Sequence, residues 1–235
     1  ADIAKEATNL GNDVVVYTTD LDFANNANTF NKNLPKKETI DNFTIKRSHV
    51  WFKIHLFFLN PGIYFQMMKD SPDIIHTVGI RSFQSFIAAI VAKKKKIPLV
   101  ISDQGGLTTH PDLKNGGIFK KILYKLQTPM INFIVNNSTK ISVANEYEKK
   151  IFEKFDQTSK IEVIRNGINL ETMKTKTDNF KKKHGIVLPF VLFIGRFSKV
   201  NGIDILLHAI KILKDQPELE NICFVIMGVD FGFQN

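Results

Sequence analysis

The stretch FVLFIGRFSKVNGIDILLHAIKIL, residues Phe190 to Leu213, decides the fold. Its first five residues, Phe190 to Ile194, form a continuous apolar run that is typical of a buried strand. A short polar loop lies between Gly195 and Gly202, and apolar residues then recur at helical spacing: Ile203, Leu206, Leu207, Ile210 and Leu213. The stretch therefore predicts a strand, a glycine-bounded turn and an amphipathic helix, which together are the repeating unit of α/β folds.

The turn in this stretch has the features of an anion-binding site. The first amides of a helix have no partner inside the helix, its dipole favours negative charge, and glycine lets a phosphate approach the backbone. Arg196 lies in the turn, and a guanidinium binds a diphosphate through paired, charged hydrogen bonds. A nucleotide diphosphate is therefore the expected ligand, although the same kind of turn also occurs in α/β domains that bind nothing.

Strand-like and helix-like segments alternate along the rest of the chain. Strands are predicted at residues 14–19, 43–47, 73–77, 98–102, 140–144, 161–164, 190–194 and 222–227. Helices are predicted at residues 3–10, 55–69, 81–95, 118–136, 146–155, 178–184 and 203–214. Pro129 is expected to kink the helix at 118–136. The alternation predicts an α/β protein with a doubly wound parallel sheet that has helices on both faces.

A polar, Lys- and Thr-rich stretch at residues 166–183 predicts a domain boundary. Residues 1–165 would form a first Rossmann-like domain, and residues 166–235 the beginning of a second. The chain opens on a helix that leads directly into a strand, so the first strand of that βαβ unit is expected upstream. The second part, about 70 residues, buries too little apolar surface to be stable alone. We therefore expect this chain to be an internal piece of a longer protein.

The charge balance limits the class of partner. The 32 Lys and Arg against 23 Asp and Glu give a net charge of +9, which favours a nucleotide, a nucleic acid or an anionic membrane. Short lysine clusters at 93–96 and 181–183 are explained as simply by solvated surface. The single cysteine, Cys223, excludes an internal disulfide and a Cys-rich metal site. No apolar run reaches the length of a membrane span.

Aromatic residues are concentrated between Trp51 and Phe58. Together with the basic charge of the chain, they could hold the first domain on an anionic membrane. The simpler interpretation, which we favour from the sequence, is that these aromatic side chains pack in the core.

Six segments occur in an order that identifies a family. They are PDIIHTVGIRSFQSFIAA, PLVISDQGGL, KISVANEYEKKIF, IEVIRNGINLE, FVLFIGRFSKVNGIDILLHAI and CFVIMGVDFGF. In this order the chain resembles glycosyltransferase family 4, whose retaining enzymes have the GT-B fold with two Rossmann-like domains facing each other across a cleft. The resemblance implies an acceptor-side first domain and a nucleotide-sugar-binding second domain. It implies no cofactor besides the donor substrate and no metal.

The resemblance assigns the donor diphosphate to the turn after residue 194. Gly195 and Arg196 match the family's Gly-Arg turn, so Arg196 is the expected catalytic group that stabilises the leaving diphosphate. The family usually has a lysine before the second glycine, where this chain has Asn201 followed by Gly202. Lys199, in the same loop, is the expected substitute for that lysine, and a degenerate copy is the alternative.

In the first domain the resemblance points to the loop after the strand at 98–102. Asp103, Gln104, Gly105 and Gly106 are expected to bind substrate there, with Gln104 where the family often has a histidine. His110, a few residues later, is a second candidate. An amide can hydrogen-bond a sugar hydroxyl, and tandem glycines allow a close approach to the backbone.

The segment VIRNGIN, residues 163–169, resembles the family's interdomain crossover. There, Asn166 and Gly167 are expected to form a turn that faces the substrate.

The function that the resemblance implies is a hexosyltransferase reaction. A sugar would pass with retention from a nucleotide diphosphate sugar to an acceptor hydroxyl, in the synthesis of a glycan, polysaccharide or glycolipid. We expect the protein in the cytoplasm, with peripheral contact to the anionic inner face of the membrane as an addition. Because the family's paired glutamates and its glycine-rich first loop are not in this sequence, the 235 residues by themselves are expected to be inactive.

Two alternatives stay open, besides the minor one of a GT-B epimerase that uses the same donors. The first is a catalytically degenerate member that binds a nucleotide sugar or serves as a scaffold, which the departures at Gln104 and Asn201 favour. The second is a nucleic-acid-binding protein, which rests on the net charge of +9 and on no recognition motif.

Overall fold

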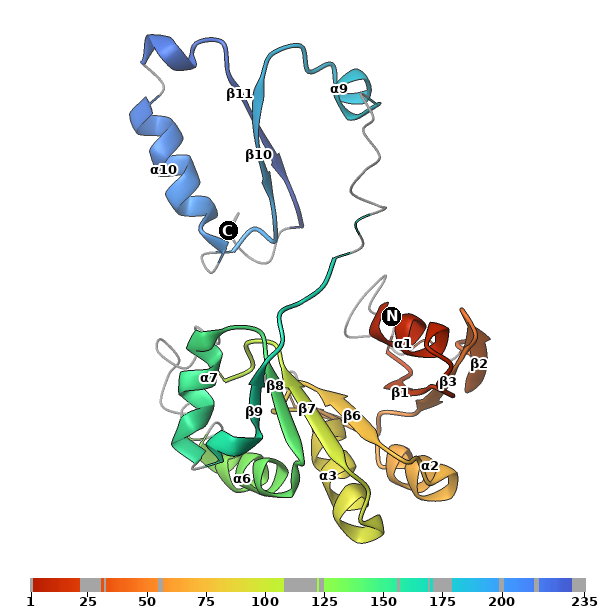
Figure 1. Ribbon diagram of the computed structural model, residues 1–235. Helices are drawn as coiled ribbons and strands as arrows, with labels where there is room; N and C mark the ends of the chain where they lie inside the picture. Colours follow the sequence, from red (N-terminus) through yellow and green to blue (C-terminus); the bar gives the residue numbers. More distant parts are fainter. Residues whose placement is uncertain are drawn as a thin grey trace. The chain divides into compact units, whose positions relative to one another are not determined.

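The computed structural model describes residues 2–21, 31, 33–54, 57–107, 122, 125–155, 157–168, 170, 179–198, 201–213 and 216–229. The chain divides into two units, Ala1–Asn166 and Gly167–Asn235. Each unit is described by itself (Figure 1). The acceptor-side and donor-side roles expected for the two parts remain predictions.

A four-stranded parallel sheet forms the centre of the first unit. Its strands are β6 (Ile75–Val78), β7 (Leu99–Asp103), β8 (Lys140–Val143) and β9 (Ile161–Val163), hydrogen-bonded in that order. All four were predicted from their apolar runs, and the bounds differ by at most two residues. Neighbouring strands are consecutive in the chain, as expected when each crossover contains a helix.

Helices bury one set of alternating side chains of this sheet. They are α3 (Phe83–Lys95), α6 (Thr128–Asn137) and α7 (Glu146–Phe152), followed by the 3-10 turns η1 (Glu153–Phe155) and η2 (Thr158–Lys160). In β7 the alternation is plain, because the first, third and fifth residues are buried and the two between them are half-buried. The core lies where α3 and α6 meet the sheet, and its fully buried side chains include Leu99, Ile101, Ile134, Ile141 and Phe152.

Residues 122, 125 and 126 are helical and Gln127 forms a turn, so helical chain is interrupted close to Pro129, where a kink was predicted. After this turn α6 begins at Thr128 and places Pro129 in its first turn. At that position the missing amide of proline costs no helical hydrogen bond. Of the earlier part of that predicted helix, residues 118–121 and 123–124 lie outside the described residues.

A second, smaller sheet contains a strand that the sequence analysis missed. After helix α1 (Asp2–Asn9), β1 (Val15–Thr19) pairs in parallel with β3 (Phe43–Ser48), and β2 (Lys37–Ile40) pairs antiparallel with β3. The two residues between β2 and β3, Asp41 and Asn42, have φ of +47° and +67°. Positive φ at both central residues is the signature of a tight hairpin turn, which Asp and Asn tolerate better than other side chains.

The helix expected at residues 55–69 is wrong in its first half. Residues Phe52–Ile54 and Phe57–Leu59 form β4 and β5, which pair antiparallel, and α2 occupies only Gly62–Asp70. Proline restricts the residue before it to extended backbone, so Pro61 keeps Asn60 out of a helix and allows one to begin after it. Phenylalanine also favours strands, which fits the hairpin.

In the second unit, β10 (Phe190–Ile194) and β11 (Cys223–Met227) pair in parallel. Helices α9 (Asn179–His184) and α10 (Ile203–Leu213) and the 3-10 turn η4 (Pro217–Leu219) complete its described elements. These elements agree with the strand, turn and helix predicted from the opening stretch. In the part of the chain that the structure describes, no helix has the length and apolar character needed to cross a membrane.

A partly buried polar contact connects α2 to the smaller sheet. The carboxylate of Asp70, at the end of α2, accepts hydrogen bonds from the Tyr17 hydroxyl at 2.7 Å and the Lys46 ammonium at 2.5 Å. Burial opposes ionisation of Asp70, but these two donors and the lysine charge together lower its pKa. Burial, and then the bond to Asp70, raises the pKa of Tyr17. The contact therefore joins β1, β3 and α2 through one carboxylate.

We predict that Tyr17→Phe lowers the free energy of unfolding by about 1 to 2 kcal/mol, because it removes a hydrogen bond to a charged acceptor. Since the pKa of folded Asp70 lies below 3.8, its value in the absence of interactions, the ionised contact is fully present above that pH. The difference in the free energy of unfolding between Tyr17→Phe and wild type should decrease as the pH falls further and Asp70 takes up a proton. Urea denaturation of the full-length protein from pH 3 to 7 measures both effects.

The matched control is Tyr147→Phe, since the Tyr147 side chain is 65% exposed and should change stability by less than about 0.5 kcal/mol. Equal effects of the two substitutions would contradict the role given to the Tyr17 hydroxyl.

Candidate functional site

Three connections meet at the carboxyl ends of the four-stranded sheet. They are the segments that follow β6, β7 and β8. The backbone changes direction at Gly79 after β6 and at Gly105 after β7, with φ of +83° and +81°. After β8, Asn145 caps α7, its side chain accepting the Glu148 amide at 2.9 Å. Ligands of parallel α/β sheets bind outside this edge, so it is the candidate site of the first unit.

Asp103 holds two of these connections together. Its Oδ1 accepts the amide of Ile80, after β6, at 3.4 Å, and its Oδ2 accepts the amide of Leu107 at 3.1 Å. The residue is only 1% exposed. Burial raises the pKa of Asp103, and the backbone hydrogen bonds partly oppose that rise. The carboxylate lies beneath the loop, so its role in this structure is to position the backbone.

The glycines of this loop make the arrangement possible. A side chain at Gly106 would place its Cβ 2.6 Å from Asp103 Oδ1, which no neighbour could accommodate without moving. The Gly106 carbonyl accepts a hydrogen bond from Arg81 Nε at 2.8 Å, and Arg81 Nη1 donates to Gln127 Oε1 at 2.9 Å. The loop is thus fixed by Asp103 from within and by Arg81 from the β6–α3 connection.

Gln104 is the exposed side chain of this group, whereas Asp103 and Gly105 are buried. The structure therefore brings the four predicted residues of this loop together but presents Gln104 at the surface. His110, the second candidate, lies outside the described residues.

In the second unit, the strand pairing continues into the predicted diphosphate turn. The amide of Gly195 donates to Met227 at 3.1 Å, and that of Phe197 donates to Val229 at 2.9 Å. A Cβ on Gly228 would collide with the Gly195 carbonyl oxygen, so the two backbones approach closely at this point. Arg196, between these two hydrogen bonds, has an exposed side chain.

Asn201 has a structural role that the sequence analysis missed. Its Nδ2 donates to the Arg196 carbonyl at 2.9 Å, and its amide donates to Ser198 at 3.0 Å. Gly202 follows with φ of +72°, and α10 begins at Ile203. The lysine that the family usually has at this position is also a hydrogen-bond donor. The shorter side chain of Asn201 donates to the Arg196 carbonyl within the same loop. Lys199 lies outside the described residues.

Asn166 and Gly167 are exposed, and they lie on either side of the division between the two units. The turn expected here is absent: residues 164–168 form neither a turn nor a bend, and Gly167 does not have positive φ. These residues are therefore extended or irregular chain, and their contact with substrate remains a prediction.

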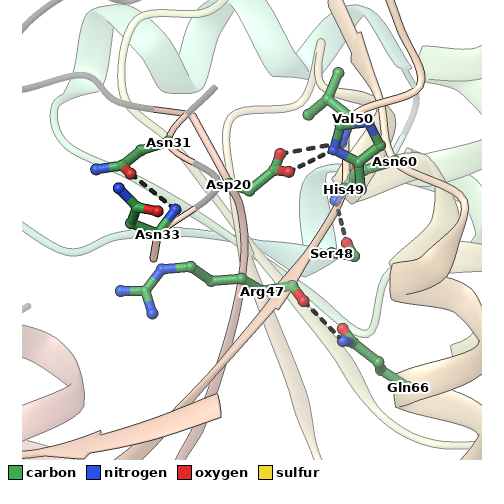
Figure 2. Close-up of polar contacts among 9 residues, drawn as sticks. All are labelled: Asp20, Asn31, Asn33, Arg47, Ser48, His49, Val50, Asn60 and Gln66. Carbon is green, nitrogen blue, oxygen red and sulfur yellow. Dashed lines mark hydrogen bonds and ion pairs between the residues drawn. The ribbon is translucent and has the colours of Figure 1, made fainter. Parts of the chain in front are cut away.

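A polar cluster at the carboxyl ends of β1 and β3 was not predicted (Figure 2). Asp20 follows β1, and its two oxygens contact the His49 Nδ1 at 2.5 Å and the Val50 amide at 3.1 Å. The pair is an ion pair whenever the imidazole is protonated. Asp20 and His49 are 29 residues apart in the sequence. The position of Asp20 directly after a predicted strand was the one signal that the sequence offered for this cluster.

Side-chain amides hold the end of β3 next to this cluster. Asn60, which is fully buried, donates from Nδ2 to Ser48 Oγ at 2.7 Å, and Gln84 Nε2 donates to Asn60 Oδ1 at 2.6 Å. Gln66 Nε2 donates to the Arg47 carbonyl at 3.1 Å, as Figure 2 shows. The end of β3 is thus held by side chains from α2, α3 and the β5–α2 connection.

We predict that Asp103→Asn lowers the free energy of unfolding by about 1 to 3 kcal/mol, because an amide NH2 would then face a buried backbone donor. The neighbouring control is Gln104→Ala, whose exposed side chain should change stability by less than about 0.5 kcal/mol. Thermal and urea unfolding of the full-length protein measure both. Wild-type stability of Asp103→Asn would overturn the positioning role.

The sequence matches the family model described as Glycosyltransferase Family 4 over residues 1–172. No curated protein matches the sequence.

Solved structures similar to this chain include HepE from Anabaena in complex with UDP, with a TM-score of 0.56, 16% identity, and coverage of 81% of this chain and 49% of that one. The same protein in complex with UDP and glucose has a TM-score of 0.57 at 14% identity, and the match covers 83% and 50% of the two chains.

Sucrose-phosphate synthase from Thermosynechococcus elongatus has a TM-score of 0.62 at 14% identity, and the match covers 97% of this chain and 55% of that one. The chain thus spans about half the length of these relatives. With the family model covering most of the residues and the α/β units matching these structures, the chain belongs to glycosyltransferase family 4 and has the GT-B type of fold.

Proposed function

We propose that the full-length protein transfers a hexosyl group with retention from a nucleotide diphosphate sugar to an acceptor hydroxyl. The observation that carries the proposal is the Gly195–Arg196 turn, which leads from β10 into α10 in a member of glycosyltransferase family 4. The turn combines an exposed guanidinium with the first amides of an 11-residue helix. Both favour the double negative charge of a diphosphate.

In the transfer reaction, this stabilisation of negative charge is needed when the bond to the diphosphate breaks. The bond between the sugar C1 and the diphosphate oxygen breaks, and the acceptor oxygen forms the new bond to C1. With retention, acceptor and leaving group lie on the same face of the sugar, so the acceptor proton can pass to the departing diphosphate. Arg196 and the amides at the start of α10 would stabilise the charge that develops on the leaving group.

Asn201 supports this role indirectly. Because its side chain donates to the Arg196 carbonyl, it fixes the backbone that carries the guanidinium. Pre-organisation of this kind lowers the cost of aligning a catalytic group. The substitution of the family's usual lysine is therefore compatible with an ordered turn, and Lys199 is proposed as the additional cation near the diphosphate.

Uridine nucleotides are the first donors to test, because the similar HepE structures contain UDP in one case and UDP with glucose in the other. The first unit is proposed to bind the acceptor, a glycan or a lipid-linked sugar, with Gln104 at its surface as a hydrogen-bonding group. Asn166 and Gly167 are proposed to line the same substrate site. A reaction on nucleotide sugars and such acceptors would take place in the cytoplasm.

We predict that Arg196→Ala weakens donor binding and lowers kcat/KM ten- to hundredfold, because a charged hydrogen bond contributes about 1.5 to 3 kcal/mol. Thermal shift of the full-length protein against UDP-, GDP- and ADP-sugars measures binding, and product formation measures transfer. The control is Lys211→Ala, which removes the same charge from the last turn of α10.

Each outcome decides between functions. Stabilisation by one donor in wild type and Lys211→Ala, lost in Arg196→Ala, supports the proposal. Donor binding without transfer to any acceptor would favour a degenerate, binding-only member. If no nucleotide sugar stabilises the protein while nucleic acid binds in a salt-dependent way, the transferase proposal fails.

A further inference from the structure

The segment that follows β3 has two exposed side chains with a buried residue between them. Val50 is 1% exposed, whereas the His49 side chain is 56% exposed and Trp51 is 74% exposed. Val50 thus packs towards the core, while His49 and Trp51, its two neighbours in the chain, face solvent.

The backbone of this segment is held rigidly. The Val50 amide donates to Asp20, and the Trp51 amide donates to the Leu59 carbonyl at 2.8 Å. The imidazole of His49 is held at Nδ1 by the same Asp20 carboxylate (Figure 2). An exposed indole on a fixed backbone needs an explanation, because large aromatic side chains are usually buried.

We propose that Trp51, His49 and Asp20 form a binding subsite for a sugar ring of the acceptor, an inference that rests on the proposed function. A pyranose has an apolar face of C–H groups and a rim of hydroxyls. The Trp51 indole would stack on the apolar face, and the imidazole and carboxylate would hydrogen-bond the hydroxyls. Ligand sites commonly combine such an aromatic surface with a few fixed polar groups.

The position of the cluster in the fold supports a ligand site. Asp20 and His49 directly follow β1 and β3, which are parallel, so both residues lie at the carboxyl ends of these strands. This is the edge at which parallel α/β units bind ligands. The buried Asn60 amide, from the β5–α2 connection, and the half-buried Gln84, from α3, hold the end of β3 at Ser48, directly before His49.

An anionic membrane would be a different partner for the exposed aromatic residues. Phe52, next to Trp51, is 60% exposed, and a membrane would use both. The basic cluster Lys93–Lys95, however, is in the last turn of α3, whereas the hairpin contacts the first turn through the Phe57–Phe83 ring pair and the Gln84–Phe58 bond. Ten residues of helix separate the two ends by about 15 Å. The carboxylate of Asp20 would also repel anionic lipid, so the sugar is the better match.

Tryptophan fluorescence tests the subsite directly, because Trp51 is the single tryptophan of this sequence. The full-length protein is titrated with methyl α-glucoside, methyl α-mannoside, methyl α-galactoside and methyl N-acetylglucosaminide. Subtraction of the Trp51→Phe titration isolates the signal of Trp51. A saturable change with at least one glycoside is expected, and it should be lost in Asp20→Asn and His49→Ala.

Kinetics provide the second measurement. Trp51→Ala should raise the acceptor KM about tenfold, the equivalent of one lost stacking contact, whereas Phe52→Ala should leave it within twofold of wild type. The matched surface control is Phe65→Ala, a 69% exposed aromatic residue on α2.

The outcomes are distinguishable from failure of the proposed function, because donor binding is measured separately by thermal shift. If donors bind but no glycoside changes the Trp51 signal and Trp51→Ala has wild-type acceptor KM, the subsite is wrong and the transferase proposal survives. Phosphatidylglycerol vesicles test the membrane contact. If they shift the Trp51 emission to the blue, Phe52→Ala abolishes this shift and glycosides leave it unchanged, the subsite is wrong and Trp51 contacts a membrane.

Discussion

The buried carboxylate of Asp103 is the interaction on which the carboxyl edge of the larger sheet depends. Parallel strands end in connections whose amides no longer have ladder partners, and these amides need acceptors. Asp103 supplies them for the connections after β6 and β7 at once. Glycine at position 106 leaves room for this carboxylate, since a Cβ there would lie 2.6 Å from Asp103 Oδ1 and one of the two would have to move. Gln104, between the buried Asp103 and Gly105, is the exposed side chain of this loop.

The same solution recurs at other strand ends. Asp20 accepts the Val50 amide after β3, Glu148 accepts the Ala144 amide at 2.8 Å after β8, and Asn201 donates to the Arg196 carbonyl after β10. In each case a short polar side chain satisfies the backbone just past a strand. The consequence for function is rigidity: Arg196 and the indole of Trp51 are carried on backbone that hydrogen bonds hold in place. Ordered groups of this kind bind charge or a sugar ring at a lower entropic cost.

The sequence was informative wherever a local pattern determines the structure. The apolar run at 190–194 and the glycines around it predicted β10, the turn and α10, because a continuous apolar run and helical periodicity are local signals. The burial expected for the strand was wrong in this unit, since Val191, Leu192 and Ile194 are exposed. The hairpin of β4 and β5 was missed since its phenylalanines fit a helical pattern equally well until Pro61 is considered. Asp103 was predicted to bind substrate because its burial could not be recognised from the local sequence. The burial depends on contact with the β6–α3 connection, which is more than 20 residues away in the chain. The Asp20–His49 contact could not be predicted, since it joins residues that only the pairing of β1 with β3 brings together.

The most direct test of the account is the stereochemistry of the reaction. The full-length protein would be incubated with an α-linked nucleotide sugar that stabilises it and with a panel of glycan acceptors, and the product would be examined by NMR. The account predicts a new glycosidic bond in the α configuration, formed with release of the nucleoside diphosphate. A β-linked product, or consumption of the donor by water alone in the presence of every acceptor, would contradict it.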